Sequence, residues 1–359
     1  MYSKMTEQFM EMVRIDSESG EEKAMMEYLL REVAELGGHG ELDAYGNLIA
    51  KFPARGCEGK APILLSCHAD TVKPGKGIEP ILDNGVIRSR GDTILGADDK
   101  AGIAEVLECV RTGTLYPPLE FVVSRQEEVG LHGVKNLDFS KVSAKIGFLM
   151  DNDTLETIVI GGPSYFTLDV TIYGKAAHAG MEPEKGINAI WAASNAISHL
   201  RVGRLDHQTT ANVGIISGGI IRNGVPDKVT FMAECRSADH EKAEALSREM
   251  VEIIRREGSA NGSRVEVEVA NLCKAVSIAP DAPVVKIAQA GLATVGINAE
   301  PIFITGFTDA SIYNNHGIEM AVVGIGAENE HSTDECISLD NMEKALLALR
   351  EMLRICATR

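Results

Sequence analysis

Five short clusters of histidine and carboxylate side chains are the parts of this sequence whose residue types could perform chemistry. They are His68 with Asp70, Asp98 beside Asp99, Glu127 beside Glu128, Asp151 alone, and His331 alone. Imidazole and carboxylate groups together suit borderline cations such as Zn²⁺. A carboxylate can also bridge two metal ions about 3.5–4 Å apart. The joint pattern therefore predicts a metal site.

Each cluster taken alone also has a purely structural explanation. Adjacent carboxylates repel each other, yet aspartate suits a helix cap and first turn, so Asp98-Asp99 could simply begin a helix. His68 could be a hydrogen-bonded histidine at a strand end, and Glu127-Glu128 a solvated loop pair. Asp151 could cap a turn, and His331 could precede a helix cap. What favours the metal site is where these residues fall relative to the predicted strands.

Most of the clusters follow apolar segments that are predicted to be strands. His68 comes after the apolar run at 63–66, the paired glutamates lie just past a second strand, and Asp151 ends a third. Strands that alternate with helices predict a three-layer α/β domain, whose sites lie at the carboxyl edge of the sheet. Near the N-terminus, Ser17 and Ser19 are expected to cap a helix.

The central part of the chain has a different pattern. Over residues 164–275 the predicted order of elements is β-α-β-β-α-β, which is that of a ferredoxin-like module. Because this module begins and ends inside the chain, we expect it to be inserted into a discontinuous domain formed by 1–163 and 276–359.

Composition narrows the range of partners. The 359 residues carry a formal net charge of -17, which argues against binding to nucleic acid or to anionic lipid. No stretch reaches the roughly 18 apolar residues of a membrane span, and the first seven residues lack a signal-peptide core. The seven cysteines are scattered without a Cys-x-x-Cys pair, which indicates reduced thiols. We expect a cytoplasmic protein without nucleic-acid or membrane partners.

Four motifs allow a family comparison: LSCHADTV at 65–72, LGADDKAG at 95–102, QEEVG at 126–130 and EHSTDE at 330–335. Together they resemble the M20 metallopeptidases, and within them the peptidase T (aminotripeptidase) branch. The resemblance covers nearly the whole chain. It implies a zinc-exopeptidase-like α/β catalytic domain, with residues 164–275 as an inserted ferredoxin-like α+β lid domain.

The resemblance implies a ligand set for two Zn²⁺ ions, which Co²⁺ or Mn²⁺ can replace. His68 and Asp151 are expected to hold one ion. Glu128 and His331 are expected to hold the other, and Asp98 to bridge both.

The resemblance also implies roles for two neighbouring carboxylates. Asp70 is expected to orient His68, since a ligating histidine usually donates its free N–H to such a group. Glu127 is expected to be the general base that takes a proton from the attacking water and returns one to the leaving amine. A cis peptide bond between Asp98 and Asp99 is implied as well.

The lid contributes a second set of candidate residues. His178, in GKAAHAG at 174–180, resembles the family histidine that stabilises the oxyanion, although it could be an ordinary loop histidine. Asn212 and Arg236 match positions that bind substrate in relatives. Arg236 could clamp a substrate carboxylate, or it could form a surface ion pair with Glu234 or Asp239.

These features predict a di-zinc exopeptidase that removes the N-terminal residue of short peptides. An M20 deacylase acting on N-acyl amino acids is the alternative, since it would use the same metals and base. A third possibility is a catalytically inactive binding protein, but no ligand position and no base is missing. The sequence departs from the family at Phe307, where a glycine usually precedes the Thr-Asp pair. A homodimer through the lid, as in many relatives, is compatible with the sequence but not decided by it.

Overall fold

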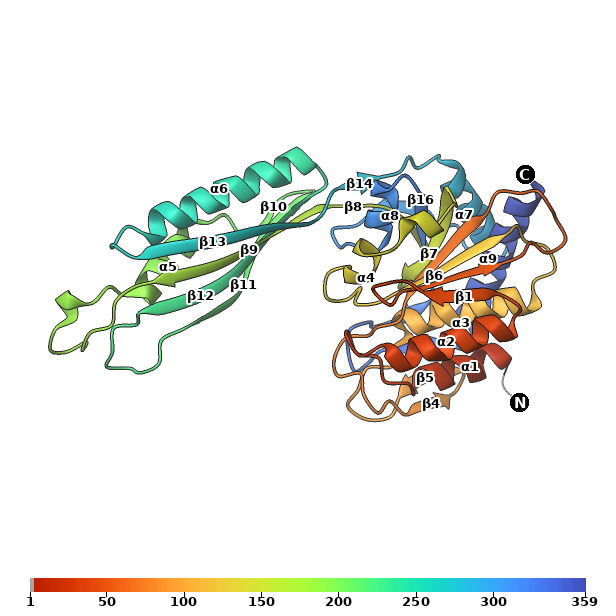
Figure 1. The fold of residues 1–359 in the computed structure, drawn as a ribbon, viewed down its shortest axis with the longest axis horizontal. Coiled ribbons are helices and arrows are strands. Elements are labelled where there is room, and N and C mark those ends of the chain that lie inside the picture. Colours follow the sequence, from red (N-terminus) through yellow and green to blue (C-terminus); the bar gives the residue numbers. More distant parts are fainter. Residues whose placement is uncertain (1–2) are drawn as a thin grey trace. The chain divides into compact units, whose positions relative to one another are not determined.

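The computed structural model describes residues 3–359 and divides into two compact units (Figure 1). Unit 1 contains the chain up to Gly161 together with Ser277–Ile304 and Thr308–Arg359. Unit 2 contains Gly162–Val276 and Thr305–Phe307. Within the described range, none of the helices combines the length and hydropathy that a bilayer crossing requires.

The main sheet of unit 1 has nine strands in the order β1-β2-β6-β3-β7-β16-β8-β14, with β15 beside β8. Their bounds are β1 His39–Leu42, β2 Leu48–Phe52, β3 Ile63–His68, β6 Leu119–Ser124, β7 Ile146–Asn152, β8 Thr157–Gly162, β14 Val276–Ser277, β15 Glu300–Phe303 and β16 Glu319–Gly324. The four central strands β6, β3, β7 and β16 are parallel. Their carboxyl ends therefore open at one edge of the sheet, where sites of such folds lie.

Helices cover both faces of this sheet. Every residue of β3 and of β6 is buried, which is why these strands read as continuous apolar runs. On one face, Leu65 and Cys67 share a hydrophobic core with five helices: α1 Lys4–Met12, α2 Lys23–Glu35, α3 Ala97–Thr112, α7 Pro283–Ala293 and α9 Leu339–Thr358. Ser66 points to the other face, because side chains alternate along a strand. Its hydroxyl lies 3.0 Å from that of Tyr313 in α8 (Ala310–Asn315). The predicted three-layer α/β architecture is confirmed.

The rest of unit 1 includes two short helical segments, α4 (His132–Lys135) and η1 (Phe139–Lys141), and a small antiparallel sheet. The sheet has the order β17-β18-β5-β4, from β4 Pro80–Asp83, β5 Val86–Ser89, β17 Ala327–Glu328 and β18 Cys336–Ser338. A two-residue turn at Asn84 and Gly85 joins β4 to β5, and both residues have positive φ as such turns require. This sheet brings the segment before Asp98 next to the segment that carries His331.

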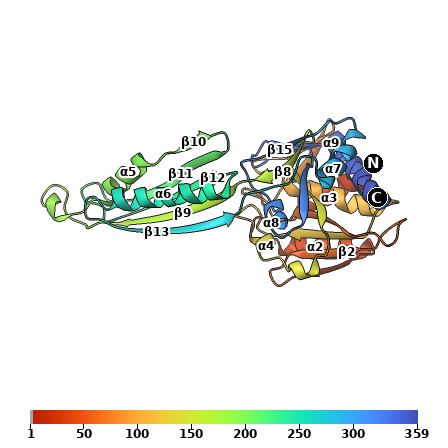
Figure 2. The same ribbon diagram turned by 90° about the horizontal axis from the view of Figure 1, so that it is seen from above.

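Unit 2 has the predicted β-α-β-β-α-β order with one additional strand. It contains β9 Ser164–Tyr173, η2 Pro183–Lys185, α5 Ala189–His199, β10 Gly203–Asp206, β11 Thr209–Gly218, β12 Lys228–Ser237, α6 His240–Gly258 and β13 Arg264–Cys273. The sheet order is β10-β11-β12-β9-β13, and α6 packs along β9 and β13 (Figure 2). The alternating apolar residues of β9 form the core with α5 and α6. The extra strand, β10, escapes prediction because it has only four residues, of which Leu205 alone is a large apolar one, and so shows no alternation.

Candidate functional site

The five predicted metal ligands meet at the carboxyl edge of the main sheet, in two groups of three that share Asp98. In the first group, His68 Nε2 lies 3.0 Å from Asp98 Oδ1 and 3.3 Å from Asp151 Oδ1. In the second group, His331 Nε2 lies 3.1 Å from Asp98 Oδ2 and 3.0 Å from Glu128 Oε1. Each oxygen of Asp98 therefore faces a different histidine, as a bridging carboxylate requires.

Separate elements deliver these side chains to one place. His68 is the last residue of β3, and Asp151 lies near the end of the neighbouring parallel strand β7. Glu128 follows β6, and His331 lies in the loop between β17 and β18. Asp98 sits at the irregular start of α3, where the Asp98–Asp99 peptide bond is cis, as the family resemblance implies.

The neighbouring Asp99 is also drawn into this cluster. Its side chain is fully buried, and its Oδ2 accepts the backbone N–H of His68 at 3.1 Å. Its Oδ1 has no hydrogen-bond partner among residues 3–359. The ligand atoms of Asp99, His68 and Asp151 lie within 4.8 Å of one another. Asp99 thus ties the turn before α3 to the end of β3.

The site concentrates negative charge in a buried place. Burial, together with the charge of Asp151, raises the pKa of Glu127 well above its ordinary value. Burial also raises the pKa of Asp151 to about 6. Hydrogen bonds to Asp98 and Glu128 raise the pKa of His331 to about 10. The protein alone therefore retains protons where cations would otherwise balance the carboxylates.

The donor set fits metal ions by its geometry as well as its charge. Around a tetrahedral ion with bonds of about 2.0–2.1 Å, ligand atoms stand about 3.3 Å apart. The nitrogen–oxygen distances within the two groups, 3.0–3.3 Å, are close to that spacing. Imidazole and carboxylate donors suit Zn²⁺ and related borderline cations.

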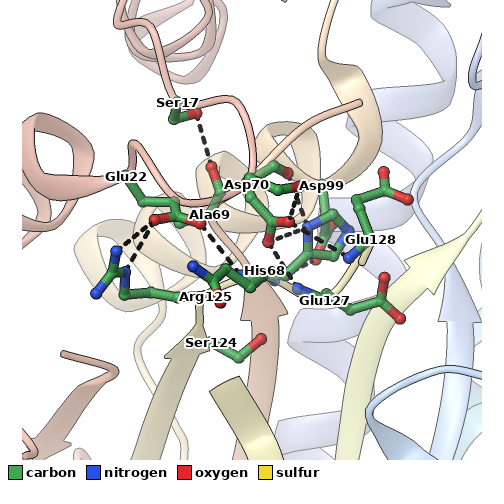
Figure 3. Close-up of polar contacts among 12 residues, drawn as sticks. Ser17, Glu22, His68, Ala69, Asp70, Asp99, Ser124, Arg125, Glu127 and Glu128 are labelled. Atoms are coloured by element: carbon green, nitrogen blue, oxygen red, sulfur yellow. Dashed lines mark hydrogen bonds and ion pairs between the residues drawn. The ribbon is translucent and has the colours of Figure 1, made fainter. Parts of the chain in front are cut away.

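Asp70 contacts three segments of the chain: the loop of Ser19, the end of β3 at His68, and the turn of Glu127 and Glu128 (Figure 3). It is fully buried, and its carboxylate accepts the backbone N–H groups of Glu127 at 2.9 Å and Glu128 at 3.3 Å. Nδ1 of His68 lies 2.9 Å from the backbone oxygen of Asp70 and 3.6 Å from its carboxylate. The ring is therefore oriented chiefly by the backbone carbonyl of Asp70, which leaves Nε2 for a ligand.

Ser17 and Ser19 do not cap a helix, contrary to the sequence-based expectation. The Ser17 hydroxyl donates to the backbone oxygen of Ala69 at 2.8 Å, and the Ser19 hydroxyl donates to Asp70 at 2.7 Å. Helix α2 begins later, with Glu22 at the N-cap position and no side-chain cap. Both hydroxyls are used to hold the loop after β3, a long-range contact that helix-capping patterns do not encode.

Sequence reasoning also missed an ion pair that supports the glutamates. Glu22 is fully buried, and its Oε2 accepts from Arg125 Nη2 at 2.7 Å and Nε at 2.9 Å (Figure 3). The other oxygen of Glu22 accepts the backbone N–H of Gln126 at 3.2 Å. This pair anchors the turn that carries Glu127. The only sequence signal would have been an arginine directly before the QEEVG motif.

In unit 2, His178 lies in an exposed loop with a defined ring orientation. Its Nδ1 accepts the backbone N–H groups of Gly180 at 3.2 Å and Met181 at 3.1 Å. An accepting Nδ1 leaves the proton of a neutral ring on Nε2, which can then donate. Asn212 is an exposed residue of β11.

Arg236 is held among aromatic and polar partners within unit 2. Its Nη2 pairs with Glu234 at 2.9 Å, and its Nη1 donates to the backbone oxygen of Thr305 at 3.2 Å. The guanidinium lies 4.2 Å from the ring centroid of Tyr165 and 5.6 Å from that of Phe307. The ion pair with Glu234 is therefore present. Phe307, where the family usually has glycine, helps to form the aromatic support.

Within one chain, His178 lies far from Arg236, whereas Asn212 is opposite Glu234, two residues from Arg236. The segment that carries His178 pairs with the loop before β12, through Ala179 N–H to the oxygen of Asn223 at 2.9 Å. Arg236 lies near the other end of β12. Eight residue steps of about 3.3 Å separate Lys228 from Arg236, or about 26 Å. His178 and Arg236 are therefore at least that far apart.

Comparisons with known proteins agree on one family. A family model described as a peptidase dimerisation domain, M20_dimer, matches residues 161–261. A tripeptidase from Staphylococcus aureus subsp. aureus Mu50 is 33% identical with a TM-score of 0.93, over 99% of this chain and 98% of that one. The aminopeptidase PepT from Bacillus cereus ATCC 10987 is 34% identical with a TM-score of 0.89, over 99% and 98%. The Bacillus subtilis (strain 168) protein YqjE is 36% identical, over 95% of both chains.

Proposed function

This chain belongs to the M20 family of metallopeptidases, in its peptidase T-like branch, and we propose that it removes the N-terminal residue of short peptides such as tripeptides. The observation that carries the proposal is the pair of histidine–carboxylate groups that share Asp98. A free glutamate beside one ligand completes the set that hydrolysis needs.

We infer that each group holds one cation. His68, Asp151 and one oxygen of Asp98 would form the first site. His331, Glu128 and the other oxygen of Asp98 would form the second. Zn²⁺ is the cation that this donor set favours, and Co²⁺ or Mn²⁺ can take its place.

Glu127 is the residue that moves protons in this proposal. Two such cations supply Lewis-acid polarisation of the peptide carbonyl and acidify the attacking water. Among residues 3–359, Glu127 is held through its backbone N–H to Asp70, while its carboxylate makes no ion pair. Burial and Asp151 raise the pKa of this carboxylate in the metal-free protein. With the cations bound, its ionised form would accept a proton from water and pass it to the leaving amine.

The residues of unit 2 would bind the rest of the substrate. The Nε2–H of His178 would donate to the oxyanion that develops on the carbonyl. Arg236 and Asn212 would bind the peptide, with the Arg236 guanidinium directed to its terminal carboxylate. Tyr165 and Phe307 would keep the guanidinium plane fixed.

We further infer that the protein acts as a homodimer through unit 2. His178 and Arg236 are at least about 26 Å apart within one chain, which is longer than a tripeptide of about 10 Å. A second copy that supplies one of the two residues removes the conflict, and the match to a dimerisation domain supports this. We also propose a cytoplasmic location, which is supported by seven cysteines that form no disulfide among residues 3–359.

The proposed function can be tested with metal-free protein reconstituted separately with Zn²⁺, Co²⁺ and Mn²⁺. Each preparation is assayed on di-, tri- and tetrapeptides and on N-acetylated amino acids, with Glu127→Ala as the inactive control. We expect release of the N-terminal residue from tripeptides, dependent on added metal. Cleavage of the acetylated amino acids without any peptide cleavage would establish the deacylase alternative instead.

A further inference from the structure

We propose that Glu335 is a positioning residue of the metal centre, which holds the turn that presents Asp98 to both histidines. The proposal rests on the function proposed above, because it concerns how the shared ligand is placed. Glu335 itself is not one of the ligands.

The carboxylate of Glu335 accepts four successive backbone N–H groups. Its Oε2 accepts from Leu95 at 2.8 Å and Gly96 at 2.7 Å. Its Oε1 accepts from Ala97 at 2.7 Å and Asp98 at 3.1 Å. Glu335 is 2% exposed, so water does not compete for these bonds. Four converging N–H groups form an anion-binding nest that the two oxygens of Glu335 fill.

Gly96 gives the turn the shape that this nest requires. Its φ is 72°, in the left-handed region that favours glycine. A Cβ at this position would also lie 3.1 Å from the methyl group of Thr71. The turn is therefore shaped around the Glu335 carboxylate and leads directly into Asp98.

Glu335 also joins two of the three segments that supply the second group of ligands, those of His331 and Asp98. It is four residues after His331 in the loop between β17 and β18. Its contacts with residues 95–98 therefore link the position of His331 to the position of Asp98, across more than 230 residues of sequence. Asp70 makes the equivalent link between His68 and the paired glutamates. Asp70 and Glu335 thus each support segments that carry proposed ligands.

The test compares two buried glutamates that both accept backbone N–H groups. Glu335→Gln keeps the size of the side chain, removes its charge and turns an NH₂ group toward N–H donors. Glu120→Gln is the matched control, because Glu120 is 3% exposed and accepts from Ser143 N at 2.8 Å and Ala144 N at 2.9 Å. Glu120 contacts none of the proposed ligands among the described residues. The probe is Co²⁺ or Zn²⁺ alone, titrated in competition with a chromophoric chelator.

We expect Glu335→Gln to weaken metal affinity about 10–100-fold, the usual effect of losing a group that supports the ligands. Glu120→Gln should lower the thermal midpoint without changing that affinity. The visible spectrum of bound Co²⁺ should change only in the Glu335 variant. If Glu335→Gln does not fold, Gly96→Ala tests the same nest and should show the same loss.

Equal metal affinity in the two glutamine variants would overturn the proposal for Glu335, while leaving the proposed function intact. A wild-type protein that binds no pair of metal ions would instead refute the proposed function itself. The two failures are therefore distinguishable in one titration series.

Discussion

In unit 1 the predicted metal ligands contact one another, whereas in unit 2 His178 lies far from Arg236 and Asn212. His68 is 1% exposed and touches two carboxylates, while His178 lies in an exposed loop and is held by its own backbone. Parallel strands that end at one edge bring distant segments together. A long antiparallel ribbon such as β11–β12 instead keeps its two ends far apart. The first unit therefore gathers its proposed ligands from one chain, whereas His178 and Arg236 of the second stay far apart.

The largest expected effect comes from the centre of unit 1. Glu127→Ala should reduce kcat by a factor of about 10²–10⁴, because the substitution removes the proposed general base. Metal affinity should stay unchanged, since Glu127 is not a proposed ligand. Steady-state kinetics and the chelator titration measure the two quantities. Unchanged turnover would remove the base assignment.

The same centre should show a strong pH dependence of metal binding. Hydrogen bonds to Asp98 and Glu128 raise the pKa of His331 to about 10, so the metal-free ring holds its proton at neutral pH. A cation needs the neutral ring and must displace that proton. Metal affinity should therefore rise with pH by up to about tenfold per pH unit for each proton released, and level off near pH 10. Calorimetry in buffers of different ionisation enthalpy counts the protons, and a pH-independent affinity would contradict this.

In unit 2, Arg236→Lys should act on substrate binding more than on turnover. Lysine keeps the charge but loses the planar fork, so KM should rise about tenfold while kcat changes less. Glu234→Gln is the control, because it frees the guanidinium from its ion pair without removing it. A fall in kcat of that size without any change in KM would show that Arg236 does not act in substrate binding.

The separation between His178 and Arg236 can be tested by mixing two inactive chains. Glu127→Ala lacks the base, and His178→Ala should lose about 10²-fold in kcat with the oxyanion donor. If a second copy supplies the histidine, co-expressed chains form mixed dimers that have one intact site each. Roughly a quarter of wild-type activity should return, because half of the dimers are mixed. Activity no higher than the sum of the separate variants would show that His178 acts within its own chain.

The smallest effect concerns a buried carboxylate of unit 1 outside the centre. Glu105 of α3 is fully buried, and neither of its oxygens has a hydrogen-bond partner among residues 3–359. Burial raises the pKa of Glu105 well above its ordinary value. The free energy of unfolding should therefore fall as pH rises above the unfolded-state pKa of about 4.3. Glu105→Met should stabilise the protein by about 1–3 kcal/mol at pH 7 and flatten that slope. Denaturant unfolding at several pH values measures both, and a loss of stability would reveal an unseen partner.

The sequence by itself determined the chemical character of the site and the class of the fold. His68, Asp98, Glu128 and His331 are recognisable because ligand types and their nearest neighbours are local information. The alternation in β9 and the apolar runs of β3 and β6 are local too, since burial on one face or two imposes a period on the chain. Strand-like segments with strong periodicity were therefore predictable, while the short polar strand β10 was not.

Only the tertiary structure decided how these pieces are paired. Nothing in the local pattern indicates that Ser17 and Ser19 bind the loop after β3 instead of a helix end. Nor does it indicate that Glu335 gathers the four N–H groups before Asp98. Such contacts join residues that are 50 to 240 positions apart. They become neighbours because the order of strands in the sheets brings their loops together. The length of β12 separates His178 from Arg236, because His178 lies beyond one end of this strand and Arg236 lies near the other.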